Sequence, residues 1–178
     1  MLRWFRRKDA MKDALRQIQK RLEELTAQYD DRAIGKAWTE LAKDKPTEHI
    51  TTAKGVLLTV RRKEVGFNKV DYSAFLAGQK ERVAWMYGQA PVYGRVQVTN
   101  ANVYEVDGKD YRRQGIGGAI YDLIERDVRA CGGDGVEPHW GSMSDEAIAF
   151  WKKRRPDQAR AIESLNRLGP GLATGLFD

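Results

Sequence analysis

The sequence is poor in the residues that build disulfides and metal centres. Its 178 residues contain one cysteine, Cys131, and two histidines, His49 and His139. An intrachain disulfide is therefore impossible, and no zinc-type ligand cluster is expected. Cys131 is also a poor candidate for a nucleophile. It follows a predicted helix, whose carboxyl-terminal dipole raises the pKa of a thiol.

Long apolar runs are absent as well, so we expect no membrane span. The basic segment 1–8 is not followed by the apolar stretch of a secretory signal. Together with the single cysteine, these features predict a cytoplasmic protein, or one packaged within a virion if a phage encodes it.

Positive charge is in moderate excess. Lysine and arginine number 31 against 25 acidic residues, which gives a net charge of +6. Such a balance permits binding to nucleic acid, to anionic surfaces or to phosphorylated ligands. The basic residues are mostly dispersed, with short runs at 6–8 and 152–155, as on many solvated surfaces. Nucleic acid stays open as a partner.

Apolar periodicity divides the chain near residue 45. One amphipathic helix is predicted over 9–30 and a second over 31–43, before Lys45-Pro46-Thr47 breaks the pattern. The seam of the first helix consists of Met11, Leu15, Ile18, Leu22, Leu25 and Tyr29. We expect an N-terminal helical extension over 1–45, used for self-association or for binding a protein partner, and a separate domain over 46–178.

The second part begins with strand signals and continues with alternating strands and helices. Strands are predicted at 56–60, 72–77, 82–87, 95–106 and 136–140, and helices at 115–129, 144–153 and 156–168. A hairpin turn is expected at 78–81, and the strand signal of 95–106 is interrupted at Asn100-Ala101-Asn102. This order predicts an α/β (α+β) fold.

The segment 111–121, Tyr-Arg-Arg-Gln-Gly-Ile-Gly-Gly-Ala-Ile-Tyr, is the most informative motif. It predicts a glycine turn between a strand and a helix, where free amides and the helix dipole suit a phosphate. A dinucleotide fingerprint fits less well, because Ile120 stands where the third glycine belongs. No Gly-Lys-Ser/Thr follows, as a P-loop requires. A tight turn before an ordinary helix remains the simple alternative.

The order Arg112-x-x-Gly115-x-Gly117 resembles the acyl-CoA pyrophosphate loop of the GNAT acetyltransferase superfamily. The segment 144–153 is similar to the fourth helix of that fold, often written Asn-x-x-Ala-x-x-Phe-Tyr. Ser144 falls at the Asn position and Trp151 at the Tyr position. The resemblance covers about residues 95–155.

This resemblance implies a GNAT-like mixed central sheet flanked by helices, with acetyl-CoA or another acyl-CoA as donor and an unidentified amine as acceptor. The cofactor-binding residues that it implies are Val106, Arg112, Arg113, Gln114, Gly115, Ile116, Gly117, Gly118, Ser144 and Trp151. Three departures are evident. The turn Asp107-Gly108-Lys109 stands where a shorter one is usual. Helices precede the first strands, and a helix replaces the two strands that usually follow the fourth helix.

Acyl transfer to an amine needs a proton acceptor, for which Glu105 and His139 are the candidates. The thiolate also needs a proton, but indole cannot supply one from Trp151. The alternative donors are Tyr104, Tyr111 and Tyr121. Two alternatives to an N-acyltransferase therefore stay open. One is a catalytically inactive GNAT-like structural or interaction module, for example in a phage particle. The other is a nucleic-acid-associated modifying protein.

Overall fold

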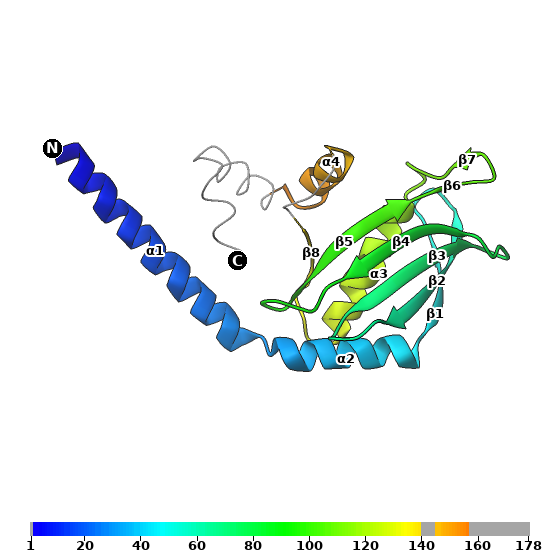
Figure 1. Ribbon diagram of the computed structural model, residues 1–178, viewed down its shortest axis with the longest axis horizontal. Coiled ribbons are helices and arrows are strands. Elements are labelled where there is room, and N and C mark those ends of the chain that lie inside the picture. Colours follow the sequence, from blue (N-terminus) through cyan, green and yellow to red (C-terminus); the bar gives the residue numbers. More distant parts are fainter. Residues whose placement is uncertain (1, 140–144, 157–178) are drawn as a thin grey trace. The chain divides into compact units, whose positions relative to one another are not determined.

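The structure is a computed structural model that describes residues 2–139 and 145–156 (Figure 1). Its elements in chain order are α1 (Leu2–Gln28), α2 (Asp31–Asp44), β1 (Thr47–Thr51), β2 (Leu57–Glu64), β3 (Val70–Leu76), β4 (Arg82–Gly88), β5 (Arg95–Val103), β6 (Glu105–Val106), β7 (Lys109–Asp110), α3 (Ile116–Ala130), β8 (Gly135–Pro138) and α4 (Asp145–Arg154). The chain divides into two compact units, one up to Glu137 and the other from Pro138 onwards.

The first unit is built on a sheet of order β1-β2-β3-β4-β5-β8. Its first five strands pair antiparallel in sequence order. Between β5 and β8, Arg95 binds Asp134 and Gln97 binds Glu137, so these two strands advance in the same direction. The parallel pair is joined through α3, as in a strand–helix–strand crossover. The mixed α+β fold predicted from the sequence is thus confirmed at the level of class.

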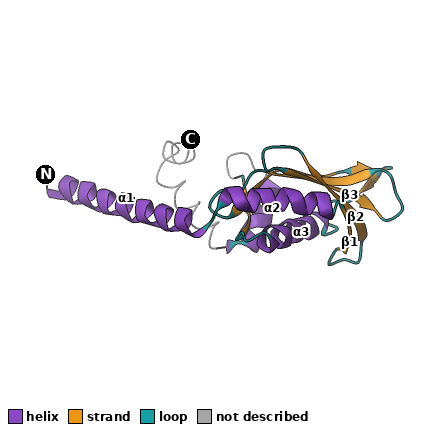
Figure 2. Ribbon diagram, turned by 90° about the horizontal axis from the view of Figure 1, so that it is seen from below, coloured by secondary structure: helices purple, strands orange, loops and turns teal. Residues whose placement is uncertain are grey.

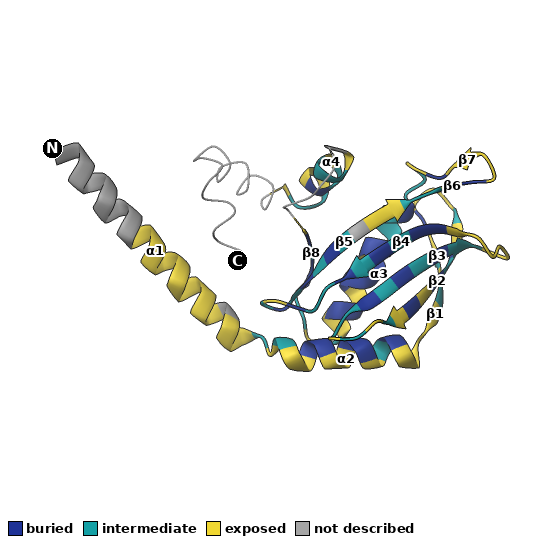
Figure 3. Ribbon diagram, in the orientation of Figure 1, coloured by how far each residue is buried: buried dark blue, intermediate teal, exposed yellow. Residues whose placement is uncertain are grey.

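Helices α2 and α3 cover one face of the sheet and contact each other (Figure 2). Helix α2 packs on β2 and β3, whereas α3 packs on β4 and β5. Trp38 of α2 donates its indole N–H to the Tyr72 hydroxyl of β3 at 2.9 Å. Leu58, Val60, Val70, Ala74, Val96, Ile120 and Ile124 are completely buried in this core or nearly so (Figure 3). Burial of these side chains against the two helices supplies most of the stabilisation.

Helix α2 therefore does not belong to a separate extension, and the prediction that all of 1–45 lies outside the sheet domain is wrong for this helix. Its apolar stripe of Ile34, Trp38 and Ala42 is buried in the core. In the described part of α1, by contrast, the seam residues Leu15 and Ile18 are 54% and 44% exposed. A helix with an exposed apolar seam gains no core burial, so α1 alone retains the character of an extension.

Three other expectations need correction. Strand β1 was not predicted, because Thr47–Thr51 carries no strong apolar alternation. Strand β5 continues through residues 100–102, but its register with β4 shifts there, between the pairs Trp85–Asn102 and Tyr87–Thr99, so the predicted interruption is a bulge and not the end of a strand. The segment 103–106 is not one strand, because β5 ends at Val103 and β6 turns back into a hairpin with β7. The helix expected at 156–168 lies, beyond its first residue, outside the described residues.

Candidate functional site

The glycine loop leads into α3, as the sequence indicates, but the element before it is the short strand β7 and not the predicted strand over 95–106. The helix N-terminus is left uncapped. Gly115 is the N-cap, with φ at 77°, and it provides no side-chain cap for the free amides. The first turn of α3 also contains no acidic residue. Because the first amides of a helix lack intrahelical partners and carry a partial positive charge, this end suits an anion.

The loop backbone adopts two left-handed conformations within three residues. Arg113 has φ at 61°, a rare value for a residue other than glycine, and Gly115 follows at 77°. A Cβ at Gly115 would also lie 3.5 Å from the Cβ of Thr52, in the turn between β1 and β2. The Thr52 hydroxyl accepts the amides of Lys54 and Val56 and so shapes that turn. The loop and the turn are therefore neighbours.

A cavity of about 400 Å³ opens between this turn and the first turns of α3. It is lined by Ile50, Thr51, Ala53, Gly115, Gly118, Ala119, Asp122, Leu123 and Arg126. Gly118 and Ala119 have little or no side chain, so the helix backbone is accessible from the cavity. The predicted phosphate-binding end of α3 thus adjoins a cavity with room for a small anionic group.

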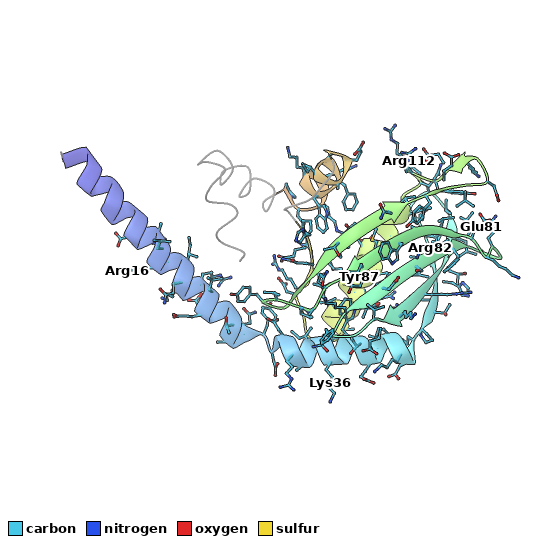
Figure 4. The ribbon with its side chains drawn as sticks, viewed as in Figure 1. Arg16, Lys36, Glu81, Arg82, Tyr87 and Arg112 are labelled. Carbon is cyan, nitrogen blue, oxygen red and sulfur yellow. The ribbon has the colours of Figure 1, made fainter. Side chains whose placement is uncertain are left out.

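The basic side chains near the cavity differ in how they are held. The guanidinium of Arg112 donates from Nε to both Asp110 oxygens, at 2.9 and 3.0 Å (Figure 4). This hydrogen bond lowers the pKa of Asp110 below its ordinary value. At the other end of the cavity, Arg126 donates to Glu48 at 2.7 Å. Arg113 is exposed on the loop. Because Asp110 balances the charge of Arg112, the amides and Arg113 remain as the attraction for an anion.

The predicted cofactor residues in the first unit do not all face the cavity. Gly115 and Gly118 line it. The Ile116 side chain is buried in the core, and a Cβ at Gly117 would point to Met86 Cε, 3.7 Å away. These two residues can therefore offer only backbone amides. Val106 is buried in the β6–β7 hairpin, and Gln114 is half-buried.

The two candidate bases lie in different units. Glu105 is exposed on β6, where it pairs with Asp110 across the hairpin. His139 is exposed in the second unit. In that unit α4 forms close to the predicted bounds, and Trp151 is buried with its ring 5.7 Å from the edge-on ring of Phe150. Ser144 lies outside the described residues.

Sequence reasoning missed the wall of the cavity formed by Thr51 and Ala53, because β1 itself was not predicted. It also missed Asp122 and Arg126, which lie on the exposed side of α3 at helical spacing from Gly118. The polar periodicity of α3 could have identified these two residues as facing away from the core.

The thiol of Cys131 has a raised pKa, as expected, but burial is the main cause and the carboxylate of Asp127 adds to it. Cys131 is the C-cap of α3. Within residues 2–139 and 145–156, acidic, histidine and cysteine side chains form no group of three or more suited to a metal ion. Over the same residues, no helix combines the length and apolar character of a membrane span.

Comparisons with protein-family models, with characterised proteins and with solved structures found no match to this chain.

Proposed function

We propose that the protein is an acyl-CoA-dependent N-acyltransferase of the GNAT type, with acetyl-CoA as the simplest donor and a primary amine as acceptor. The observation that carries the proposal is the uncapped N-terminus of α3, opening through Gly115 and Gly118 onto the 400 Å³ cavity. The crossover from β5 through α3 to β8, followed by α4, has the element order that the resemblance implies.

The fit of the donor to these residues rests on the backbone. A pyrophosphate needs several N–H donors at one place, and the amides from Arg113 to Gly118 supply them at a helix N-terminus. Gly115 holds a left-handed conformation that most residues adopt only with strain, so the loop shape depends on glycine. The exposed Arg113 adds charge, whereas Asp110 balances the charge of Arg112. The cofactor, when bound, supplies an activated acyl thioester.

The residues of the chain then have to orient the amine and take up its proton. Glu105 is the better candidate of the two bases, because it is exposed on the hairpin that leads directly into the glycine loop. A carboxylate there accepts the proton directly or through water. Trp151 supplies no proton, so in this proposal the departing thiolate takes its proton from water.

A turnover assay tests the proposal. Purified full-length protein is incubated with acetyl-CoA and a panel of primary amines, and free thiol and acylated amine are both measured. We expect amine-dependent release of thiol, reduced about 10²- to 10⁴-fold in Glu105→Gln without a change in acetyl-CoA affinity. The same loss in His139→Ala would instead assign the base to His139. Binding of acetyl-CoA without turnover of any amine would identify an inactive module of the same fold.

A further inference from the structure

The face of the sheet opposite α2 and α3 carries a concentration of aromatic and basic side chains. Cross-strand register places Phe75 opposite Arg82, and Trp85 opposite Ser73, which in turn pairs with Arg61. One row further along the sheet, Tyr87 pairs with Asp71, and Asp71 pairs with Lys63. Directly opposed residues on one face are neighbours in space. Three rings and three cations therefore share one surface of β2, β3 and β4.

The rings and cations are in direct contact. The Arg61 guanidinium lies 4.6 Å from the centre of the Phe75 ring. Arg82 lies 5.5 Å from the Trp85 ring and 5.6 Å from the Tyr104 ring. Trp85 and Tyr87 lie 6.5 Å apart on the same strand. In Figure 4, Tyr87 and Arg82 are seen on this face, with α3 behind the sheet.

These aromatic residues are not core residues. Phe75, Trp85 and Tyr87 are each only half-buried, whereas Tyr72 and Met86 on the opposite face are buried almost completely. The indole N–H of Trp85 is shielded from water and meets no hydrogen-bond acceptor among the described residues. Several large rings together on a half-exposed sheet face are typical of a binding surface. The unpaired indole N–H of Trp85 on this face also requires an explanation.

The chemistry of this face matches that of a single strand of nucleic acid. Bases without a pairing partner stack on aromatic rings and on guanidinium planes, while lysine and arginine bind the backbone phosphates. The one carboxylate within these rows, Asp71, accepts the Ser73 hydroxyl at 3.1 Å and lies opposite Lys63. Three cations against this one carboxylate leave the face with a positive excess.

We infer that this aromatic face, defined by Phe75, Trp85 and Tyr87 with Arg61, Lys63 and Arg82, binds single-stranded nucleic acid. Bases stack on the rings, and the cations bind the phosphates. A duplex is a poorer ligand, because its bases are stacked on each other and a broad sheet face does not fit into a groove. This site is separate from the glycine loop, so the two assignments stand or fall independently.

Fluorescence anisotropy with labelled 12-mers of deoxythymidine and of uridine tests the inference on the full chain. We expect binding to one or both, and preference for one identifies DNA or RNA as the source. Tyr87→Ala should weaken binding by roughly tenfold or more, as loss of a stacked base does. Arg61→Glu should weaken it and reduce the salt slope by about 0.7 or more, since each lost phosphate contact contributes that much.

The matched control is Lys36→Glu, which changes the net charge equally on the exposed side of α2 (Figure 4). It should leave affinity almost unchanged. Trp85→Phe should retain binding but lose the quenching of tryptophan fluorescence by the oligonucleotide. The inference is wrong if neither 12-mer binds at low salt. It is equally wrong if Lys36→Glu and Arg61→Glu weaken binding alike, or if polyglutamate or duplex DNA competes as well as the single strand.

Discussion

Arg62 on β2 and Asp127 on α3 form a buried bidentate ion pair through the centre of the first unit. The guanidinium donates from Nε to Oδ2 at 2.6 Å and from Nη2 to Oδ1 at 3.1 Å. Neither side chain is more than 4% exposed. The pair also receives the Tyr72 hydroxyl, which donates to Asp127 at 2.9 Å, and Tyr72 accepts from Trp38. One polar network therefore joins α2, β2, β3 and α3.

Breaking this pair should destabilise the fold strongly. In Asp127→Asn, the positive charge of the buried Arg62 guanidinium loses the carboxylate of Asp127 and keeps only that of Glu48. Loss of one partner of a buried pair typically costs about 3–5 kcal/mol. Urea unfolding followed by circular dichroism measures the change in the free energy of unfolding. Arg61→Met, an exposed neighbour on the same strand, is the control and should stay within about 0.5 kcal/mol. Equal effects of the two substitutions would show that the buried network contributes little.

Stability should also depend on pH through Glu48. Burial alone would raise the pKa of this carboxyl, but hydrogen bonds from Arg62 and Arg126 outweigh burial and lower it below 4.5. A carboxyl with a lowered folded-state pKa stabilises the fold above its ordinary pKa, and this stabilisation disappears as pH falls through the folded-state value.

Glu48→Gln should therefore be less stable than the natural protein near pH 7, and the difference should shrink on acidification below about pH 4.5. Thermal unfolding at a series of pH values measures it. Glu81→Gln, at an exposed turn position, should show no such trend. A constant difference between Glu48→Gln and the natural protein across the pH range would contradict this account.

Periodicity and turn chemistry made much of the first unit predictable. The hairpin of β3 and β4 and the bounds of α3 follow from apolar patterning and from glycine positions. The position of α2 did not follow, because an amphipathic helix has the same pattern whether it covers its own sheet or a partner. The ion pair of Arg62 with Asp127 joins residues far apart in sequence, so no local signal indicated it.

The candidate site was predictable only in part for a similar reason. The loop from Arg112 to Gly118 is a local motif, and its uncapped helix start follows from glycine at the N-cap. Its cavity depends on contact with the turn at Thr52, which is a tertiary feature. The aromatic face was missed because Phe75, Trp85 and Tyr87 align only once the strand register is known.

Truncation should distinguish the two N-terminal helices. Removing residues 1–27 deletes most of α1 and should leave a folded protein. Even Leu22, the least exposed of the three seam residues Leu15, Ile18 and Leu22, is 38% exposed, so the helix contributes little to the core. Removing residues 1–45 also removes the buried Trp38 and should unfold the protein.

If α1 self-associates through its seam, the protein without residues 1–27 should have a smaller oligomeric state than the full chain. Size-exclusion chromatography with light scattering measures this difference. Leu15→Lys, which disrupts the seam in the full chain, should have the same effect.

A folded 46–178 fragment would contradict the assignment of α2 to the core.

Freeing Arg112 should strengthen anion binding at the glycine loop. Asp110→Asn removes the carboxylate that pairs with Arg112 but keeps its shape. We expect acetyl-CoA to bind about twofold to fivefold more tightly, a change typical of one exposed charge, and the gain should vanish at high salt. Asp107→Asn, in the neighbouring hairpin turn, is the control and should have less effect. Weaker binding by Asp110→Asn would mean that the pair positions Arg112 for the ligand.

Calorimetric titration with acetyl-CoA, comparing the natural protein with Gly118→Asp and Gly118→Asn, tests the central claim most directly. Residue 118 lies in the first turn of α3 and lines the cavity. A carboxylate in the first turn interacts favourably with the helix dipole, so the protein should still fold. Its negative charge, however, repels a phosphate at the same amides. The account predicts stoichiometric binding by the natural protein, at least about tenfold weaker binding by Gly118→Asp, and a smaller loss in Gly118→Asn. Absence of binding by the natural protein, or equal affinities of the Asp and Asn variants, would contradict it.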